Sequence, residues 1–351
     1  MRIGIPRELK PLEGRVGLIP AAAAELVRHG HQVFIEKNAG IKSGYSDENF
    51  RSVGVEVLNT AADVYGKAEM IVKVKEPIKA DLELLRKDHL LFCYLHLAAL
   101  PELTESLKKI GCTAVAFETV EEDGRLPLLA PMSDIAGRLS IQVGTHLLHQ
   151  PMGGKGILLG GVPAAKRGRV VIVGAGVAGG ASATVAAGMG AQVTVFDISR
   201  DRMERMRDLG PNVTALYPHT ADIAEAVKYA DIVVGAVLVT GEKAPHVVSA
   251  DMVRSMQPGS VVADISVDQG GCVETTKPTT WDNPTYVWEG ITHFTVTNMP
   301  GAVPRTSSQA LSAAITPYAV KLAAGGWRDL ESLRKGINVE GGKVVHPALL
   351  K

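Results

Sequence analysis

The feature that most constrains the fold is the stretch VVIVGAGVAGG, from Val170 to Gly180. It begins as an apolar run typical of a buried strand and continues into glycines spaced G-x-G-x-x-G at Gly174, Gly176 and Gly179. In this pattern the first glycine makes a tight turn, the second lets a pyrophosphate approach the backbone, and the third lets the next helix pack on the strand. The N-terminus of that helix offers N–H groups to phosphate. The pattern predicts a dinucleotide-binding βαβ unit.

The residues that follow agree with such a unit. Small residues at 177–189 favour a helix, and residues 192–196 read as a second strand that ends at Asp197, 23 residues after Gly174. An acidic residue at this spacing binds the adenosine ribose and repels a 2′-phosphate, so we expect NAD as the cofactor. Two alternatives remain at this stage. The glycines could form a turn without a ligand, and Asp197 could only cap the next helix.

Length and charge exclude several classes of protein. A chain of 351 residues suggests two domains. Lys plus Arg and Asp plus Glu each number 37, which argues against a nucleic-acid binder and leaves self-association open. Cys93, Cys112 and Cys272 form no CxxC pair, which fits a reducing compartment, and we expect Cys93 and Cys112 to be buried because they lie in apolar runs. Because the first residues lack the apolar core of a signal peptide, we expect a cytoplasmic protein.

One segment raises the possibility of a membrane span. Residues 170–196 include no charged side chain and are long enough to cross a bilayer. Six glycines interrupt this segment, and each interior glycine costs a helix about 1 kcal/mol relative to alanine. We therefore expect no membrane helix.

Short apolar runs and helical patterns alternate along the chain. In the first part, strands are predicted at residues 2–6, 31–35, 55–58, 70–74, 90–97 and 113–119, with helices at 20–29, 47–53, 61–67 and 101–110. In the second part, strands are predicted at residues 170–173, 192–196, 213–216, 232–237, 261–265 and 294–297. This alternation is typical of parallel sheets built from βαβ units.

The fold class expected is therefore α/β, with two doubly wound Rossmann-like domains joined by long helices at residues 133–150 and 307–324. We expect the C-terminal segment to return to the first domain. The predicted substrate domain comprises residues 1–128 and 307–351, and the predicted NAD-binding domain comprises residues 129–306.

Ligands of open α/β sheets bind outside the carboxyl ends of the strands, so polar residues there are candidates for a site. They are Arg15, Lys75, His96, Asp268 and Asn298. Each has an alternative reading: Arg15 as a surface charge, Lys75 with Lys73 as edge-strand lysines, His96 as a core residue, and Asp268 as a turn residue. Their convergence on predicted strand ends favours a ligand site.

Other catalytic and metal motifs are absent from the sequence. His146 and His149 share a predicted helix without a nearby acidic partner, so we predict no metal site. The chain has no G-x-S-x-G elbow and no P-loop.

Taken together, several motifs resemble the alanine dehydrogenase family. They are RIGIPRE, GRVGLIP, VKVKEP, LHLA, LLAPMSDIAGRLS, VGAGVAGG, ISVDQGG and NMPGAVPRTSS, and they run from Met1 to about Trp327. The resemblance implies reversible oxidative deamination of L-alanine to pyruvate and ammonium with NAD. It also implies a homohexamer.

The resemblance further implies residue roles. Arg15 and Lys75 hold the carboxylate and carbonyl of the substrate, and His96 and Asp268 transfer protons. The cofactor contacts implied, together with the glycines of the turn, are Ser133, Gly174, Gly176, Gly179, Asp197, Arg202, Val237, Leu238, Ile265, Ser266, Val267, Lys277, Val296, Thr297, Asn298 and Met299.

Two other functions stay open. The NAD-binding subunit of proton-translocating transhydrogenase shares RIGIPRE and the glycine fingerprint, but it has no histidine where this chain has His96. A nucleotide-sensing regulatory protein without catalysis is the third reading. The retention of Arg15, Lys75, His96 and Asp268 together argues against it.

Overall fold

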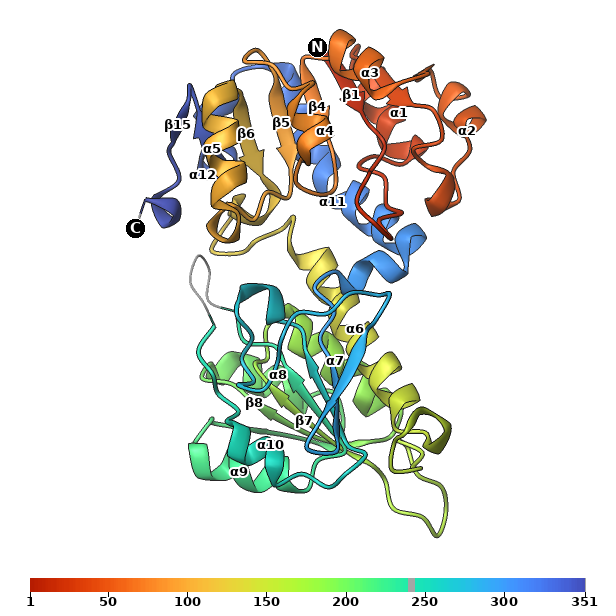
Figure 1. Cartoon of the computed structure of the whole chain (residues 1–351), viewed down its shortest axis with the longest axis vertical. Helices are drawn as coiled ribbons and strands as arrows, with labels where there is room; N and C mark the ends of the chain where they lie inside the picture. The colour runs from red at the N-terminus through yellow and green to blue at the C-terminus, as the bar shows by residue number, and fades with distance from the viewer. Residues whose placement is uncertain (239–243, 351) are drawn as a thin grey trace. The chain divides into compact units, whose positions relative to one another are not determined.

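The computed structural model describes residues 1–238 and 244–350 (Figure 1). The chain divides into unit 1, made of Met1–Met132 and Gly301–Lys351, and unit 2, made of Ser133–Pro300. The predicted divisions, at 128/129 and 306/307, lie a few residues from these. The predicted end of the first domain, residue 351, lies outside the described residues.

Unit 1 contains a mixed sheet whose central strands are parallel. Its strands are β1 (Arg2–Ile5), β2 (Gln32–Glu36), β3 (Glu56–Leu58), β4 (Met70–Val72), β5 (Leu90–Cys93), β6 (Thr113–Ala116), β14 (Ile337–Glu340) and β15 (Lys343–Val344). Their order is β15-β14-β6-β5-β4-β1-β2-β3, and β14 pairs antiparallel with β6. The chain therefore builds outward in one direction from β1 and in the other from β4, and this reversal is where open α/β sheets bind ligands.

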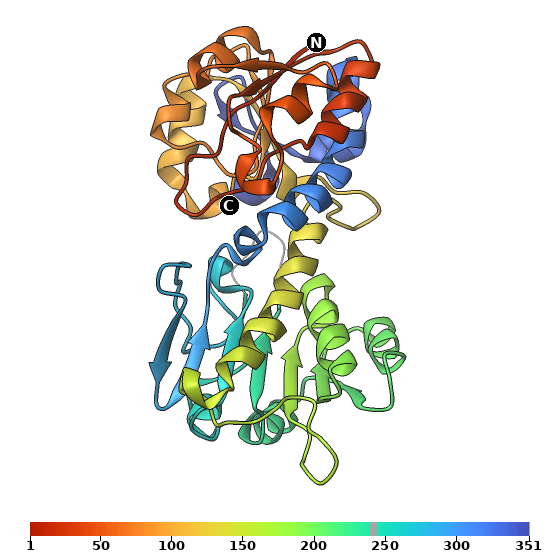
Figure 2. The same cartoon turned by 90° about the vertical axis from the view of Figure 1, so that its right-hand side faces the viewer.

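Helices cover both faces of this sheet (Figures 1 and 2). They are α1 (Pro20–Arg28), α2 (Asp47–Arg51), α3 (Ala61–Lys67), α4 (Lys79–Leu82), α5 (Pro101–Ile110), α11 (Pro304–Ala324) and α12 (Glu331–Lys335). As predicted, Pro20 begins α1, where its missing N–H costs nothing. The buried hydroxyls of Ser308 and Ser312 on α11 accept the N–H groups of Val16 and Ile19, both at 3.0 Å. Two hydrogen bonds thus fix the loop that follows β1.

Unit 2 contains a second doubly wound sheet. Its strands are β7 (Arg169–Val173), β8 (Gln192–Phe196), β9 (Val213–Leu216), β10 (Ile232–Gly235), β11 (Val261–Asp264), β12 (Thr285–Trp288) and β13 (Ile291–Phe294). They lie in the order β12-β13-β11-β10-β7-β8-β9, with only β12 antiparallel to its neighbour. Here the strand order reverses between β7 and β10.

Both faces of this sheet are buried by helices. They are α6 (Ala130–Leu147), α7 (Val177–Gly188), α8 (Arg200–Arg207), α9 (Thr220–Lys228) and α10 (Ala250–Arg254). Along β7, Val170 and Ile172 join the core formed with α6, α7 and α8, whereas Val171 and Val173 join the core formed with α9 and α10. Burial on both faces explains why β7 reads as a continuous apolar run.

The structure corrects three predictions. The strand predicted at 294–297 runs instead at Ile291–Phe294, because the left-handed residues Glu289 and Gly290 (φ 50° and 80°) turn the chain back from the unpredicted strand β12. The sequence prediction also omitted β14 and β15, which continue the sheet of unit 1 as expected for a returning C-terminal segment. Of the two long helices, only α6 spans the division between units, since α11 lies wholly in unit 1.

Residues 170–196 form β7, α7 and β8 rather than one long helix. In the part of the chain that the structure describes, no helix combines the length and the apolar character that a membrane crossing requires. All three cysteines are buried and free.

Close packing of α6 on α7 generates a stability prediction. A Cβ added at Gly137 of α6 would lie 2.1 Å from the backbone oxygen of Ala178 in α7. We expect Gly137→Ala to destabilise the protein by about 1–3 kcal/mol, because overpacking outweighs the gain of about 1 kcal/mol in helix propensity. Denaturant unfolding measures the change.

The matched control is Gly188→Ala in α7, where an added Cβ meets no atom within 4 Å. This control should be neutral or stabilising by up to about 1 kcal/mol. Equal stability of the two variants would mean that α6 and α7 do not pack as described.

Candidate functional site

Three predicted site residues follow neighbouring strands of unit 1. Arg15 lies in the loop after β1, Lys75 follows β4, and His96 follows β5, and these strands are adjacent in the order β5-β4-β1. All three are thus at the carboxyl edge of the sheet, and Arg15 and Lys75 flank the reversal of strand order. This is the position at which doubly wound sheets receive ligands.

Arg15 is buried and held by Glu13. Its Nε donates to Glu13 Oε1 at 2.7 Å and its Nη2 donates to Oε2 at 2.5 Å, and the side chain of Arg15 is only 2% exposed. Burial lowers the pKa of Arg15, but the hydrogen bonds and charge of Glu13 outweigh it, so the net shift is upward. Of the five N–H donors of a guanidinium, Glu13 receives two. The carboxylate therefore fixes the plane in which Arg15 presents its charge.

Lys73 and Lys75 have different surroundings. Both come after β4 ends at Val72, and β4 is an interior strand, so the edge-strand reading of these lysines is wrong. Lys73 Nζ is buried at 3.0 Å from both carboxylate oxygens of Asp81 and at 3.8 Å from Glu8. Glu8 in turn accepts the N–H of Val74 at 2.7 Å. Lys73 is therefore part of a buried ionic core beneath the segment that carries Lys75.

Lys75 is partly exposed and belongs to a second charged cluster. Its Nζ lies 3.4 Å from Oε2 of Glu76, whose Oε1 is hydrogen-bonded to Lys10. Burial raises the pKa of Glu76, but the opposing effect of Lys75, Lys10 and His96 is larger, so the net shift of the pKa is downward. The carboxyl group is therefore held as an anion. Glu76 therefore joins two cations and the candidate histidine electrostatically.

His96 occupies a strained turn rather than a strand. Strand β5 ends at Cys93, and the backbone of His96 is left-handed at φ 51° and ψ 37°. Its imidazole stacks on the ring of Tyr94 with centroids 5.8 Å apart and planes 10° apart. His96 is partly buried and lies in a turn, so the alternative in which it is a core residue of a strand is wrong.

The glycine turn of unit 2 has the geometry that its spacing predicts. Gly174 has φ 97°, and an added Cβ would lie 2.5 Å from the backbone oxygen of Ala236, after β10. A Cβ at Gly179 would lie 1.7 Å from the oxygen of Gly174, so the helix packs directly on the turn. At Gly176 no described atom lies within 4 Å of an added Cβ. Close packing therefore explains why Gly174 and Gly179 lack a side chain. The open space at Gly176 is instead what the approach of a ligand would require.

Asp197 lies at the end of β8 beside this turn. Its Oδ2 accepts the N–H of Ala175 at 2.6 Å and its Oδ1 accepts the N–H of Ser199 at 2.7 Å. The N-cap of α8 is Ser199 and not Asp197, which removes the capping alternative. Arg202 Nη1 lies 3.7 Å from Oδ2. Asp197 therefore links the glycine turn to the start of α8.

Loops after β10 and β11 carry a further group of predicted residues. Val237 and Leu238 follow β10, and the hydroxyl of Ser266 donates to the carbonyl of Val237 at 2.7 Å. Asp268 is exposed in the 3₁₀ turn Val267–Gln269 after β11. The remaining members of the group are Ile265 and Val267 in the same loop.

The loop that carries Asp268 is organised by Asp264, a buried residue that ends β11. Its carboxylate accepts the N–H groups of Ser266, Cys272 and Val273 at 3.0–3.1 Å and the hydroxyl of Thr276 at 2.8 Å. Burial raises the pKa of Asp264 even though each of these hydrogen bonds lowers it. One carboxylate thus shapes the whole 264–276 segment.

The remaining predicted cofactor residues lie on three segments of unit 2. Lys277 donates its N–H to the hydroxyl of Tyr286 at 3.0 Å, and its Nζ lies 4.7 Å from that ring's centroid. Asn298 accepts from the indole of Trp281 through its backbone oxygen at 3.0 Å. The others are Val296 and Thr297 after β13, Met299 at the start of a 3₁₀ turn, and Ser133 in α6.

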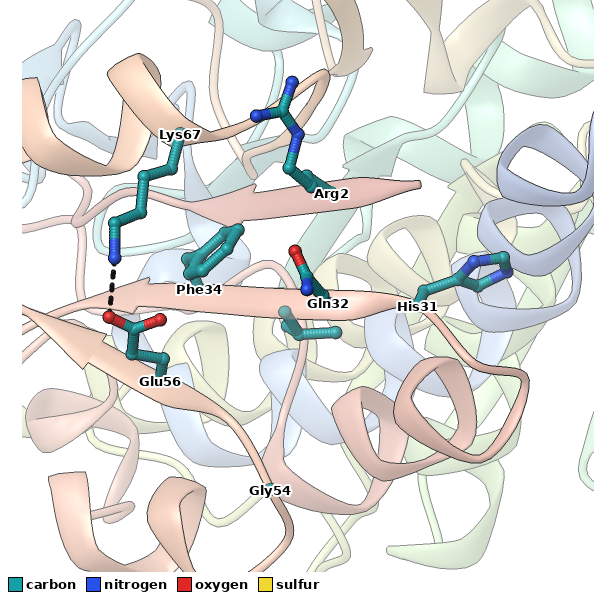
Figure 3. A pocket seen from close by; sticks show the side chains of 8 residues that line it. Arg2, His31, Gln32, Phe34, Gly54, Glu56 and Lys67 are labelled. Atoms are coloured by element: carbon teal, nitrogen blue, oxygen red, sulfur yellow. Dashed lines mark hydrogen bonds and ion pairs between the residues drawn. The ribbon is translucent and has the colours of Figure 1, made fainter.

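A surface pocket elsewhere on unit 1 contains none of the predicted residues. Figure 3 shows its lining side chains, among them Arg2, Gln32, Phe34, Glu56 and Lys67. Arg2 and Gln32 begin β1 and β2, so the pocket is at the amino ends of these strands. Lys67 pairs with Glu56 at 2.6 Å and lies over Phe34. The pocket is thus separate from the candidate site at the carboxyl edge.

No group of three His, Cys, Asp or Glu side chains in the described ranges could hold a metal ion. His146 and His149 place their ring centroids 5.8 Å apart without a third ligand.

The sequence analysis missed Glu13, Glu76 and Asp264. Glu13 and Glu76 lie next to predicted cations in the motifs EGRV and VKVKEP. A search for carboxylates that neutralise buried cations would have found both. Asp264 lies one residue before the end of the strand predicted at 261–265, so a search of polar residues near strand ends would have included it.

Comparison with known proteins shows what the chain is similar to. Family models described as alanine dehydrogenase/PNT match residues 4–136 with the N-terminal domain and residues 140–347 with the C-terminal domain. An alanine dehydrogenase of Methanococcus maripaludis is 48% identical, and the match covers 100% of this chain and 96% of that protein. A solved L-alanine dehydrogenase superposes with a TM-score of 0.95 at 51% identity, covering 99% of this chain and 98% of the other. A transhydrogenase of Sinorhizobium meliloti, with a TM-score of 0.85 and 24% identity over 99% of this chain and 100% of the other, shares the fold.

The two lysines after β4 generate a stability prediction. We expect Lys73→Met to cost about 3–5 kcal/mol, because it leaves the buried carboxylates of Asp81 and Glu8 without their cation. Lys75→Met should cost less than about 1 kcal/mol, because Lys10 remains paired with Glu76. Urea unfolding of both variants measures the difference.

The cost of Lys73→Met should shrink as the pH falls. Burial raises the pKa of Glu8 above its usual value, so as the pH falls Glu8 takes up a proton in the folded protein before it does so in the unfolded chain. Protonation removes the unpaired charge and therefore favours the folded state. If Lys75→Met proves the more destabilising of the two, the assignment of the buried ionic core is wrong.

Proposed function

Because this chain belongs to the alanine dehydrogenase/PNT family, we propose that it is an NAD-dependent dehydrogenase that interconverts L-alanine with pyruvate and ammonium. One alanine, one NAD⁺ and one water give pyruvate, NADH, ammonium and a proton. The observation that carries the proposal is that one chain combines Arg15, Lys75 and His96 at one sheet edge with the glycine turn and Asp197 of a dinucleotide site.

The residues of unit 2 suit a dinucleotide. The open space at Gly176 supports binding of a pyrophosphate at the N-terminus of α7, and we propose that the carboxylate of Asp197 accepts a hydrogen bond from a ribose hydroxyl. When bound, NAD supplies the acceptor for the hydride that leaves the Cα of alanine. The protein residues bind, orient and move protons around that transfer.

Binding of the substrate is proposed for Arg15 and Lys75. Glu13 fixes the guanidinium of Arg15, which receives the substrate carboxylate in a pre-set plane. Lys75 supplies a compact charge for the carbonyl oxygen of pyruvate and can exchange its ion pair with Glu76 for the substrate. Fixing both groups orients the Cα–H bond and lowers the entropic cost of reaction.

Proton transfer is proposed for His96. Oxidation of the amine gives an iminium, which water attacks to form a carbinolamine that expels ammonia. An imidazole can take the proton of that water and return one to the leaving amine. Asp268 is proposed to stabilise the positive charge on nitrogen.

Two other functions are weighed against this proposal. The transhydrogenase match, at 24% identity, supports the fold alone, and by the family resemblance that subunit has no histidine at the position of His96. A nucleotide sensor has no need of the strained backbone at His96. We also propose, from the family resemblance, that the chain forms a homo-oligomer, and, from its N-terminal residues and its cysteines, that it acts in the cytoplasm.

The first prediction from this proposal is alanine-dependent reduction of NAD. Purified protein should form NADH with L-alanine and consume NADH with pyruvate plus ammonium, followed by absorbance. His96→Asn should fold and bind NADH like wild type, while turnover falls about 10²–10⁴-fold, the usual worth of general acid–base catalysis.

The control is His146→Asn on α6, which should keep full turnover. Wild-type protein that binds NADH without turning over alanine would favour the sensor reading. A folded His96→Asn protein with near-normal kcat would overturn the role of His96.

The second prediction concerns cofactor choice. Wild type should prefer NAD to NADP in kcat/KM, because the carboxylate of Asp197 repels a 2′-phosphate. Asp197→Ala should shift the ratio toward NADP, since Arg202 remains beside the vacated position and can pair with the phosphate.

Asp201→Ala, an exposed change in the first turn of α8, is the matched control and should leave the ratio unchanged. The assignment of Asp197 fails if its variant keeps the wild-type preference.

A further inference from the structure

The starting observation is the backbone of His96. A left-handed backbone at φ 51° is uncommon for a residue other than glycine, although histidine, asparagine and aspartate adopt it more often than the rest, and it persists where neighbouring groups hold it. The side chain that holds it is that of Glu118, in the 3₁₀ turn Phe117–Thr119 after β6. Because β6 is the neighbour of β5, the two turns emerge side by side at the carboxyl edge.

Glu118 accepts hydrogen bonds from two successive backbone N–H groups of the turn. Its Oε1 and Oε2 accept the N–H of Leu95 at 3.0 and 3.2 Å, and its Oε1 also accepts the N–H of His96 at 2.5 Å. Two successive N–H groups that point at one acceptor form a concave anion-binding geometry. An ionised carboxylate makes such bonds stronger than a neutral acceptor would.

The imidazole is then fixed by its neighbour. Tyr94 stacks on His96, and its hydroxyl donates to the carbonyl of Leu128 at 2.6 Å. Phe117, next to Glu118 in sequence, packs edge-on against Tyr94 with centroids 5.0 Å apart. The turn after β6 therefore supports both the backbone of His96 and the ring on which its imidazole lies.

We propose that Glu118 is a positioning residue that sets the orientation of His96 for proton transfer. It acts through the backbone at residues 95 and 96 and not by touching the substrate. This inference rests on the proposed function, in which His96 transfers protons. Nothing in the sequence near His96 marks the partner, because the two residues are 22 positions apart.

Two variants of Glu118 separate the effect of its hydrogen-bond acceptors from the effect of its negative charge. Glu118→Ala removes both acceptors and should lower kcat about 10–100-fold, since misplacing a catalytic group by about 1 Å costs up to 10²-fold. Glu118→Gln keeps one oxygen that can accept both N–H groups and should lose less than 10-fold. The KM for NADH should stay at the wild-type value in both, because Glu118 is in unit 1 and the dinucleotide residues are in unit 2.

A double-mutant cycle tests whether Glu118 acts through His96. In the His96→Asn background, Glu118→Ala and Glu118→Gln should lower kcat no further, because the imidazole that Glu118 positions is gone. A general structural role would instead lower kcat by the same factor in both backgrounds. Glu121→Ala, which removes a surface partner of Lys335 from the same loop, is the control and should keep wild-type kcat.

The outcomes distinguish failure of the role proposed for Glu118 from failure of the proposed function. Wild type inactive with alanine refutes the proposed function. Active wild type with equal losses in the two backgrounds, or with no loss in Glu118→Ala, refutes the role of Glu118 alone. If Glu118→Ala does not fold, the Glu118→Gln arm decides, and its kcat loss must again vanish in the His96→Asn background.

Discussion

The parallel pairing of β1 with β4, and of β7 with β10, is the constraint on which the rest of the structure depends. At each pair the strand order reverses, so the following loops leave toward opposite faces and open a space at the carboxyl ends. In unit 2 that space is bounded by Gly174, which can take no side chain without meeting the backbone at Ala236. In unit 1 it is bounded by the loops of Arg15 and Lys75. The same topology therefore yields a backbone site for phosphates in one unit and a cluster of charged side chains in the other.

Each of the cations near the strand-order reversal of unit 1 is paired with a carboxylate; Arg15 and Lys73 are buried, and Lys75 is partly exposed. Arg15 has Glu13, Lys73 has Asp81 and Glu8, and Lys75 has Glu76. Burying an ion is costly unless it is paired and hydrogen-bonded, and a buried pair adds little net stability. What the pairing provides instead is a fixed orientation of the charged side chain. A guanidinium held by two hydrogen bonds, or an imidazole held through its backbone by Glu118, presents one geometry to a ligand.

Much of the fold could be predicted because its local rules are strong. Positions of β7, α7 and β8 follow from an apolar run, three spaced glycines and a small-residue helix, and those glycines have the contacts expected of them. Edge strands were harder. The hairpin of β12 and β13 depends on a turn at Glu289 and Gly290, and β14 is a strand only because β6 offers it an antiparallel partner. Short edge strands carry little periodic pattern of their own.

The sequence by itself determined the doubly wound α/β class, the dinucleotide turn and the residues after each strand, because backbone sterics and burial act over a few neighbouring positions. Only the tertiary structure decided which charges meet. The hydrogen bond from Val16 to Ser308 joins residues 292 positions apart, and that from His96 to Glu118 joins residues 22 apart. It also decided that Lys73 is a buried cation paired with Asp81, while Lys75, two residues later, is partly exposed and paired with Glu76. Such pairings arise from the order of strands in the sheet, and they cannot be predicted from the spacing of residues along the chain.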